Sequence, residues 1–217
     1  KTLSELACTL WGDPSQKMHV IGITGTKGKT TTATMLSHIL NSVGIPTGYI
    51  GTNGISYSSV ERTTANTTPD PLTLQQTLYD MHRCGIRAVV MEVSSQGLMQ
   101  SRVAGVKFGT VLFTNLYLDH VGTSEHPTFE HYRATKHSLF TDYDARFVVY
   151  NADDPHASQV IAGCNCPSKG IAVRSRADYT ADSITYFRSP GTIGVSFHCR
   201  VDGMDDSSFP VSLAFPG

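Results

Sequence analysis

The stretch from Met18 to Thr32 constrains the fold more than any other part of the chain. It reads MHVIGIT and then GTKGKTTT, and apolar residues follow at helical spacing from Met35 to Val43. A short apolar run, a glycine-rich turn and a helix opened by lysine and threonine predict a strand, a loop and a helix in direct succession. Gly44 and Pro46 mark the end of that helix, where glycine and proline are common.

The glycine-rich turn has the composition of a phosphate-binding loop. In such a loop, backbone N–H groups point toward a phosphate chain, Lys29 supplies a positive charge to its outer phosphates, and the Thr30 hydroxyl can bind Mg²⁺. The strict pattern GxxxxGK[ST] requires a glycine where this chain has Ile23. The alternative is an ordinary turn that happens to contain Gly-Lys-Thr. Because a strand precedes the turn and a helix follows it, we predict phosphate binding.

Further apolar runs alternate with helical patterns along the chain. Asp70 and Pro71 form a good cap and first turn for a helix with Leu74, Leu78 and Met81 on its inner face. Continuous apolar runs, typical of parallel strands buried on both faces, occur at residues 88–93, 109–114, 147–150 and 170–173. We therefore predict an α/β fold with a doubly wound, mostly parallel sheet and ligands at the carboxyl ends of its strands.

The sequence pattern changes after Arg174. Short β-like runs at 183–187, 194–201 and 209–215 are separated by turn residues, which predicts a small antiparallel β-sheet at the C-terminal end. We expect three parts: a linker at 1–17, a phosphate-binding P-loop core at 18–175, and an antiparallel β subdomain of the same domain at 176–217. No closing element follows the last run, so we expect a segment of a longer protein.

Composition excludes several classes of protein. Seventeen basic and 18 acidic residues leave a net charge of −1, so no overall basic field exists to hold nucleic acid or an anionic membrane. No apolar run approaches the ~20 residues of a spanning helix, and we expect a soluble, cytoplasmic protein. The five cysteines are an odd number, which suits a reducing compartment. Cys164 and Cys166 could form half of a metal clip, but free thiols are favoured because no second pair lies at zinc-ligand spacing.

Two strand ends carry residues that could bind a metal ion. Glu92 ends an otherwise apolar run, and Asp119 and His120 follow the next strand pattern by a few residues. Glu92 either faces the phosphate loop or turns to solvent, and a lone histidine is more commonly a hydrogen-bonded loop residue. The carboxyl ends of parallel strands meet at one edge of a sheet, so we favour a shared metal site.

Lys136 is unusual because it projects from the inner face of a predicted helix that starts near His126. The inner face of this helix consists of Phe129, Tyr132, Leu139 and Phe140. A lysine there must extend to water, bind an anion or lose its charge. An uncharged amine can add carbon dioxide to become a carbamate. Extension to water is favoured from the spacing alone.

Six motifs in order give the chain a family resemblance. They are GTKGKTTT, NTTPD (66–70), MEVSSQGLMQSRV (91–103), FTNLYLDH (113–120), HYRATK (131–136) and NADDP (151–155). Together they resemble the central ATP-binding domain of the Mur ligases, most closely the MurE branch, whose members extend a UDP-N-acetylmuramoyl-dipeptide in peptidoglycan synthesis. The resemblance covers essentially the whole chain.

The resemblance implies a set of site residues. The ATP phosphates would be held by Gly25, Thr26, Lys27, Gly28, Lys29, Thr30 and Thr31. Two Mg²⁺ ions are implied, one bound by Thr30 and Glu92 and one by His120. The catalytic group would be Lys29, Glu92, His120 and Lys136, with Lys136 carbamylated to N6-carboxylysine by CO₂. Substrate binding is implied for Asn66, Thr67, Thr68, Ser94 and Arg102, and adenine-side binding for Asn151 and Asp153.

The resemblance also implies a reaction and its partners. A carboxylate of UDP-N-acetylmuramoyl-L-Ala-D-Glu attacks the γ-phosphate of ATP, and an amino acid then displaces phosphate from the acyl phosphate to form an amide. The chain departs from the family at Gln96, where histidine is common, at 121–132, and at Lys27, which replaces a frequent asparagine. Nothing resembles the family's N-terminal UDP-binding domain or its C-terminal domain, so we expect the segment alone to bind nucleotide and to ligate nothing.

Three other functions remain as alternatives. The first is a non-catalytic nucleotide-binding module of Mur ligase type, and the second is another amide ligase of the same family. The third is an ordinary P-loop phosphotransferase. It is disfavoured because no strand ending in aspartate matches the usual second nucleotide motif.

Overall fold

The computed structural model describes residues 1–119, 121–122, 125–143, 145–203 and 208–216. Within these residues, an eleven-stranded sheet has the order β11-β10-β9-β8-β7-β6-β1-β5-β2-β3-β4. The strands are β1 His19–Thr24, β2 Thr47–Gly51, β3 Gly54–Tyr57, β4 Val60–Arg62, β5 Ala88–Glu92, β6 Thr110–Phe113, β7 Val148–Asn151, β8 Ser168–Ala172, β9 Tyr179–Ser189, β10 Thr192–Val201 and β11 Ser208–Pro216. All pairings from β2 through β5, β1, β6, β7 and β8 to β9 are parallel.

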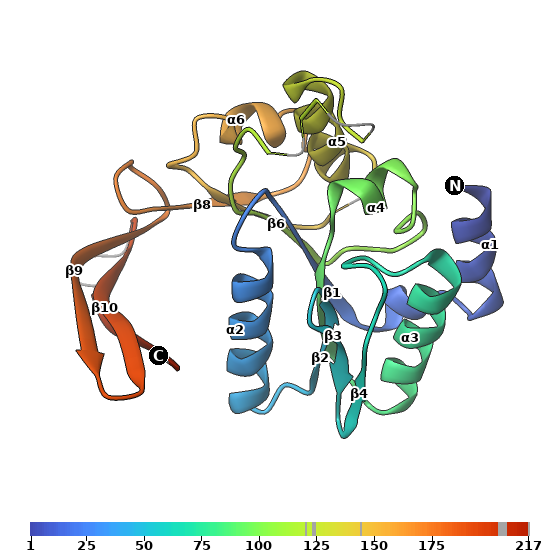
Figure 1. Ribbon diagram of the computed structural model, residues 1–217, viewed down its shortest axis with the longest axis horizontal. Helices are drawn as coiled ribbons and strands as arrows, with labels where there is room; N and C mark the ends of the chain where they lie inside the picture. Colours follow the sequence, from blue (N-terminus) through green and yellow to red (C-terminus); the bar gives the residue numbers. More distant parts are fainter. Residues whose placement is uncertain (120, 123–124, 144, 204–207, 217) are drawn as a thin grey trace.

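Helices cover both faces of the parallel part of the sheet. They are α1 Thr2–Leu10, α2 Lys29–Ser42, α3 Pro71–Arg83, α4 Ser95–Met99, α5 Phe129–Thr141 and α6 Ala157–Val160, with a 3-10 turn η1 at Pro14–Lys17. In Figure 1, α2 stands on one side of the central strands and α3 on the other. Within the described residues, no helix is long and apolar enough to cross a membrane.

Two apolar clusters form the core, one on each face of the sheet. The larger joins Leu74, Leu78 and Met81 of α3 and Leu139 of α5 to the sheet, and the smaller packs α2 against β1 and β5. The inner stripe expected for α3 is therefore confirmed. The stripe expected for α2 is only partly inward, because Ile39 remains 49% exposed.

The caps of two helices explain where they begin. Asp70 accepts hydrogen bonds from the backbone N–H groups of Leu72 and Thr73, so α3 starts at the predicted cap. Thr128 accepts from the N–H of His131 and caps α5, which begins a little later than the sequence suggested. The helix still carries Lys136 on its buried face.

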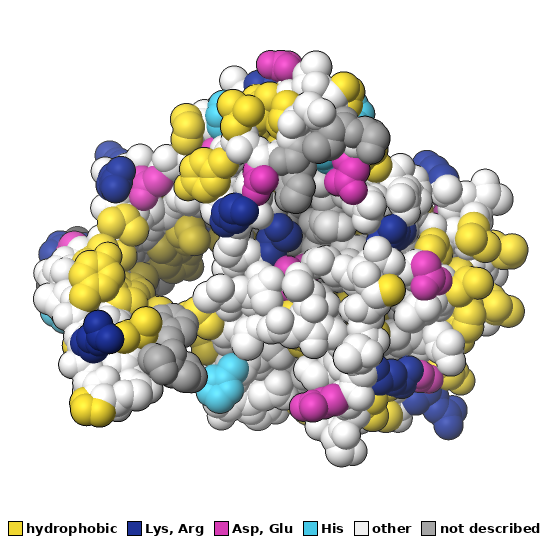
Figure 2. Space-filling view, in the orientation of Figure 1, with side chains coloured by type: hydrophobic (Ala, Val, Ile, Leu, Met, Phe, Trp, Pro, Cys, Tyr) yellow, Lys and Arg dark blue, Asp and Glu magenta, His cyan; other side chains and the backbone are white. Residues whose placement is uncertain are grey.

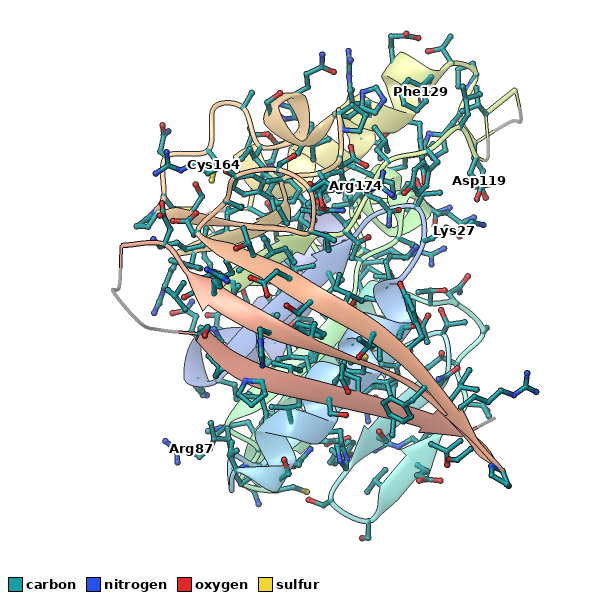
Figure 3. All side chains as sticks on the ribbon, turned by 90° about the vertical axis from the view of Figure 1, so that its left-hand side faces the viewer. Lys27, Arg87, Asp119, Phe129, Cys164 and Arg174 are labelled. Carbon is teal, nitrogen blue, oxygen red and sulfur yellow. The ribbon has the colours of Figure 1, made fainter. Side chains whose placement is uncertain are left out.

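The C-terminal strands form a lobe, β9–β11, beyond α2 (Figures 1 and 3). Its strands pair antiparallel, as predicted, β10 with β9 on one side and with β11 on the other. The lobe is also continuous with the main sheet, because β9 pairs parallel with β8 at two positions, Ile171 with Tyr179 and Ala172 with Thr180. In Figure 2 a hollow separates much of the lobe from the rest of the molecule.

The first seventeen residues, expected as a linker, contain α1 and η1. The hydroxyl of Ser4 donates to the carbonyl oxygen of Ser101, and Cys8 is buried. The leucines of α1 point outward, and Leu3, Leu6 and Leu10 are 54%, 65% and 70% exposed. Figure 2 shows an apolar surface at its right edge, where Figure 1 places α1.

Candidate nucleotide-binding site

The central strands end at one edge of the sheet, and a pocket opens there. Parallel pairing places Ile23 beside Glu92 and Thr24 beside Phe113, so β1, β5 and β6 finish at the same level. The chain leaves β1 for β2, which lies to one side in the sheet, and leaves β5 for β6, which lies to the other side. The change of direction makes this edge a topological switch point. The pocket, of about 360 Å³, is lined by Thr26, Lys27, Gly28, Lys29, Thr30, Thr52, Thr67, Glu92, Ser94, Ser95, Gln96, Glu125, Tyr132 and Lys136.

The loop between β1 and α2 is held from the β6 side. Lys27 donates its N–H to the Asn115 side-chain oxygen, and its carbonyl oxygen accepts from the side chains of Thr114 and Asn115. Gly25 has φ +150°, and a Cβ atom at this position would collide with the Thr114 hydroxyl. Glycine is therefore required here by both backbone angle and space. Sequence reasoning missed Thr114 and Asn115 as supports, although both stand in one of the six motifs.

Glu92 is fully buried and faces the phosphate loop, not solvent. Its Oε2 accepts a hydrogen bond of 2.9 Å from the Thr30 hydroxyl. Its Oε1 accepts from the Tyr49 hydroxyl at 2.7 Å and from the Thr52 N–H at 3.0 Å. Burial and the bond to Glu92 raise the pKa of Tyr49, so the phenol stays protonated and keeps donating. The carboxylate is thus fixed next to the start of α2.

Tyr49, Gly51 and Thr52 belong to the site but were not predicted from the sequence. A Cβ atom on Gly51 would collide with Glu92 Oε1 and the Tyr49 hydroxyl. Thr52 adds a second hydrogen bond to Glu92, from its hydroxyl to Oε2 at 3.3 Å. No strand was predicted for the segment TGYIGT, because its two glycines are rare in strands. The glycine at position 51 was the one sequence feature that could have indicated another group lying close to the backbone of this strand.

Two lysines converge on the phosphate loop. Lys29 Nζ donates to the carbonyl oxygens of Gly25 and Thr26 at 2.9 and 3.0 Å, and Lys136 Nζ donates to the Gly25 oxygen at 3.0 Å. Lys136 is 1% exposed, and its Nζ lies 4.5 Å from the centre of the Tyr132 ring. Its amino group therefore does not extend to water. The spacing alone had favoured extension to water, and that expectation was wrong.

The environment of Lys136 favours the uncharged amine. Burial lowers its pKa well below the ordinary value, and the positive charge of Lys29 lowers it further, whereas Asp119 acts in the opposite direction. Burial also lowers the pKa of Lys29, but the charge of Glu92 opposes that shift. The two lysines are therefore unequal, and Lys136 is the one disposed to lose its proton.

Lys27 forms an ion pair at the mouth of the pocket. Its Nζ lies 2.8 Å from Asp119 Oδ2, and Figure 3 shows the two side chains on facing loops. The Lys27 side chain is 72% exposed, so the pair is accessible from solvent. His120, the predicted ligand of a second metal ion, lies outside the described residues.

The predicted substrate residues form a second group beside Glu92. The Thr68 hydroxyl donates to the Glu92 carbonyl oxygen at 3.0 Å and accepts from the Ser94 N–H at 2.9 Å. Ser94 also caps α4. Arg102 is 8% exposed and donates to the Thr68 carbonyl oxygen at 2.8 Å. A cation and two hydroxyls thus stand next to the phosphate pocket.

The other two residues of the Asn-Thr-Thr motif are half-buried. Thr67 lines the pocket and lies 3.1 Å, oxygen to oxygen, from the hydroxyl of Thr52. Asn66 is also half-buried, beside the pocket-lining Thr67. The motif therefore reaches the site through Thr67 and Thr68.

Asn151 ends β7 and Asp153 follows it, and the two residues hold the segments after β6 and β8. Asn151 donates from its side chain to the Thr114 carbonyl oxygen and accepts from the Asp153 N–H. The Asp153 carboxylate accepts from the N–H groups of Val173, Arg174 and Ser175, which lowers its pKa. Both residues thus shape the surface beside the phosphate loop, and a direct contact with adenine stays a prediction.

The geometry defines a class of protein. A glycine loop opens a helix at the switch point of a parallel sheet, and a lysine, a threonine hydroxyl and a buried carboxylate surround it. This arrangement suits a nucleoside triphosphate with a divalent cation. The fold and the site are those of a P-loop nucleotide-binding domain.

Comparison with known proteins identifies the family. Residues 23–217 match the model of the Mur ligase middle domain, and the chain belongs to this family. It is 42% identical over 163 residues to the UDP-N-acetylmuramoyl-L-alanyl-D-glutamate–2,6-diaminopimelate ligase of Aquifex aeolicus, a match that covers 74% of this chain and 33% of that protein. The resemblance to the MurE branch is confirmed.

Solved structures agree with this assignment. A ligase of the same name superimposes with a TM-score of 0.81 and 27% identity, covering 96% of this chain and 42% of that one. The MurF ligase of Thermotoga maritima in complex with ADP has a TM-score of 0.66 and 19% identity, covering 95% and 44%, and shares the fold. The chain therefore spans between a third and just under half of the length of these relatives.

Proposed function

We propose that this chain is the ATP-binding part of a ligase that adds an amino acid to UDP-N-acetylmuramoyl-L-Ala-D-Glu in peptidoglycan precursor synthesis. One observation carries the proposal: Lys29, Thr30, Glu92 and Lys136 line one pocket. Thr68 and Arg102, on which the dipeptide substrate would bind, lie directly beside it. Use of ATP and of a UDP-linked precursor fits a cytoplasmic protein.

The donor set fits Mg²⁺. Mg²⁺ prefers one or two carboxylates together with phosphate oxygens, and Glu92 offers a buried carboxylate 2.9 Å from the Thr30 hydroxyl. Because Tyr49 and Thr52 already satisfy Oε1, Oε2 is the oxygen directed to the loop. When bound, the ion neutralises charge on the phosphates. We assign Thr30 and Glu92 to one ion and His120 to a second.

We assign a carbamate to Lys136. The ammonium group first loses one proton; the resulting buried amine attacks CO₂, forming an N–C bond and releasing a second proton. In total two protons leave, and a cation becomes an anion. Two features support this: Lys136 is 1% exposed, and its pKa is lowered by burial and by Lys29. The carbamate anion would face the Lys29 ammonium group. It would replace the present arrangement, in which two lysine side chains share the Gly25 carbonyl oxygen.

The residues of the chain position the reacting groups. The N–H groups of the phosphate loop and the N-terminus of α2 hold the phosphates, and Lys29 exchanges its carbonyl partners for their oxygens. Arg102, Thr68 and Ser94 hold the dipeptide so that its carboxylate oxygen attacks the γ-phosphorus and ADP leaves. The amine of the amino acid then attacks the acyl carbon, phosphate leaves and a proton is released. Asn151 and Asp153 shape the adenine side.

The relatives reported above suggest which amino acid to test first. Their names specify 2,6-diaminopimelate, and we propose this compound over L-lysine. The neighbouring parts of the relatives have no counterpart in the 217 residues, so the assay requires the complete protein.

The test measures phosphate release by the complete protein. We expect release only when ATP, Mg²⁺, UDP-N-acetylmuramoyl-L-Ala-D-Glu and the amino acid are all present, with one amide formed per phosphate. The 217-residue chain alone should bind ADP without forming amide. Hydrolysis at the same rate without the dipeptide substrate would contradict the proposal. Nucleotide binding without any ligation by the complete protein would favour the non-catalytic module.

A further inference from the structure

Two thiols meet in the loop between α6 and β8, away from the candidate site. The sulfur atoms of Cys164 and Cys166 lie 3.1 Å apart, and neither cysteine is in a disulfide. Both residues are half-buried. In Figure 3, Cys164 lies far from Lys27 and Asp119 at the mouth of the nucleotide pocket. The proposed function gives this pair no role.

The fold holds this loop in place from both ends. On one side, the Cys164 N–H donates to the Ile161 carbonyl oxygen at 3.2 Å, and Gly163 makes the turn with φ +75°. On the other side, the Pro167 carbonyl oxygen accepts from the N–H of Val148 in β7 at 3.0 Å. Both cysteines also pack against the main apolar cluster. The two sulfurs are therefore brought together by the folded chain and not only by their closeness in sequence.

We propose that Cys164 and Cys166 are a modification site, a dithiol that is oxidised reversibly to a disulfide within the loop. The two sulfurs need to approach by only about 1 Å, since a disulfide bond is ~2.05 Å long. Half-burial leaves the thiols within reach of a small oxidant. The proposal does not rest on the ligase function.

The chemistry balances with glutathione disulfide as the oxidant. One cysteine thiolate attacks a glutathione sulfur, forming a mixed disulfide and releasing one glutathione thiol. The second cysteine then attacks the mixed disulfide and releases the other glutathione. In total, two thiols of the protein lose two electrons and two protons, and one glutathione disulfide becomes two glutathione thiols.

The other cysteines provide internal controls. Cys8 is buried under Gly105, Cys84 is exposed after α3, and Cys199 lies in β10. Among the described residues, the Cys164–Cys166 contact is the one sulfur–sulfur contact observed. Burial, and next the contact with Cys164, raise the pKa of Cys166 to about 11. Since such a thiol reacts slowly near neutral pH, the equilibrium rather than the rate should be measured.

The experiment equilibrates the complete folded protein in glutathione buffers of increasing oxidised fraction. Free thiols are then alkylated, and the protein is digested with trypsin under non-reducing conditions. Cleavage after Arg146 and Lys169 releases peptide 147–169, which contains Cys164 and Cys166 and no other cysteine. We expect this peptide to change from doubly alkylated to unalkylated and two hydrogens lighter, and dithiothreitol to reverse the change.

Variants and an unfolded reference decide the outcome. In Cys164→Ser and in Cys166→Ser, we expect the remaining cysteine to carry glutathione instead. In urea, we expect half-oxidation to require an oxidised-to-reduced ratio at least ~10-fold higher, because the fold no longer places the thiols together. The proposal fails if peptide 147–169 stays doubly alkylated at the most oxidising ratio. It also fails if peptide 147–169 of the wild-type protein accumulates glutathione adducts, or if the urea midpoint equals that of the folded protein; adducts on the exposed Cys84 do not bear on it.

Discussion

Lys136 Nζ donates a hydrogen bond of 3.0 Å to the carbonyl oxygen of Gly25, 111 residues earlier in the chain. The bond joins the buried face of α5 to the first turn of the phosphate loop. Lys29 shares the same acceptor at 2.9 Å. Two cationic side chains on one carbonyl oxygen are unfavourable unless one is neutral, modified or opposite an anion. The bound nucleotide and a carbamate would each relieve this arrangement.

Replacement of Lys136 tests the carbamate. We expect Lys136→Ala and Lys136→Arg to lower phosphate release in the complete protein by at least ~100-fold, with ATP affinity within about threefold of wild type. Arginine keeps the positive charge but cannot form the carbamate, so it separates charge from modification. We expect bicarbonate to rescue Lys136→Ala weakly or not at all. Near-normal turnover by Lys136→Arg would exclude the assigned role.

Glu92→Gln should change the Mg²⁺ requirement. The amide keeps the shape but loses the charge that attracts a divalent cation. We expect the Mg²⁺ concentration for half-maximal activity to rise at least ~10-fold, while metal-free ADP binding, measured by calorimetry, changes less than about threefold. Glu61→Gln on β4 is the control, because Glu61 is exposed. An unchanged Mg²⁺ requirement would remove Glu92 from the metal site.

Gly51→Ala should displace Glu92 and Tyr49 from their positions in the site. The added methyl group would collide with Glu92 Oε1 and the Tyr49 hydroxyl, so we expect a loss of ~1–3 kcal/mol in the free energy of unfolding, measured in urea, together with weaker Mg²⁺ binding. Gly44→Ala is the matched control. Gly44 has φ +81° and open space around it, so alanine there should cost about 1 kcal/mol of stability and leave metal binding intact. Equal effects of both variants on Mg²⁺ binding would contradict the assigned contact.

Gln75→Met should stabilise the protein. Gln75 in α3 is fully buried, and within the described residues neither its Oε1 nor its Nε2 has a hydrogen-bond partner. Methionine fills a similar volume without the unsatisfied amide, so we expect a gain of ~1–2 kcal/mol in the free energy of unfolding. Gln76→Met, on the exposed side of the same helix, should change stability by less than about 0.5 kcal/mol. A destabilised Gln75→Met variant would show that the amide is satisfied in solution.

Asp70 should give α3 a pH-dependent cap. Burial alone would raise its pKa, but hydrogen bonds from Thr73 and Leu72 outweigh this and leave the pKa below the usual 3.8. The stabilisation is therefore complete above 3.8 and is lost as the pH falls through the lower value of the folded state. Asp70→Ala should cost ~1 kcal/mol at neutral pH. Asp70→Asn should keep most of the stability and flatten its decline between about pH 5 and pH 2, measured by thermal unfolding. An unchanged acid dependence in Asp70→Asn would assign the titration to other carboxyls.

Several elements escaped the sequence patterns for physical reasons. Strands β2, β3 and β4 are short, and β2 and β3 contain Gly48, Gly51 and Gly54. These glycines allow other groups to approach the backbone closely, which hydrophobic periodicity does not indicate. Helix α1 buries Ser4, Ala7 and Cys8 and exposes its leucines, the reverse of the usual apolar face. Which face of α1 is buried therefore depends on the segments that pack against it, and the local sequence does not reveal those segments.

The sequence by itself determined the strand–loop–helix unit at Met18 to Val43, the positions of the buried strands along the chain and the Asp70 cap, because these rest on local periodicity and capping. The tertiary structure decided the rest. It alone shows Tyr49 and Thr52 holding Glu92, and Lys136 facing inward with a lowered pKa rather than extending to water. Hydrogen bonds and desolvation depend on distances between residues far apart in the chain, and those distances exist only after the sheet has formed.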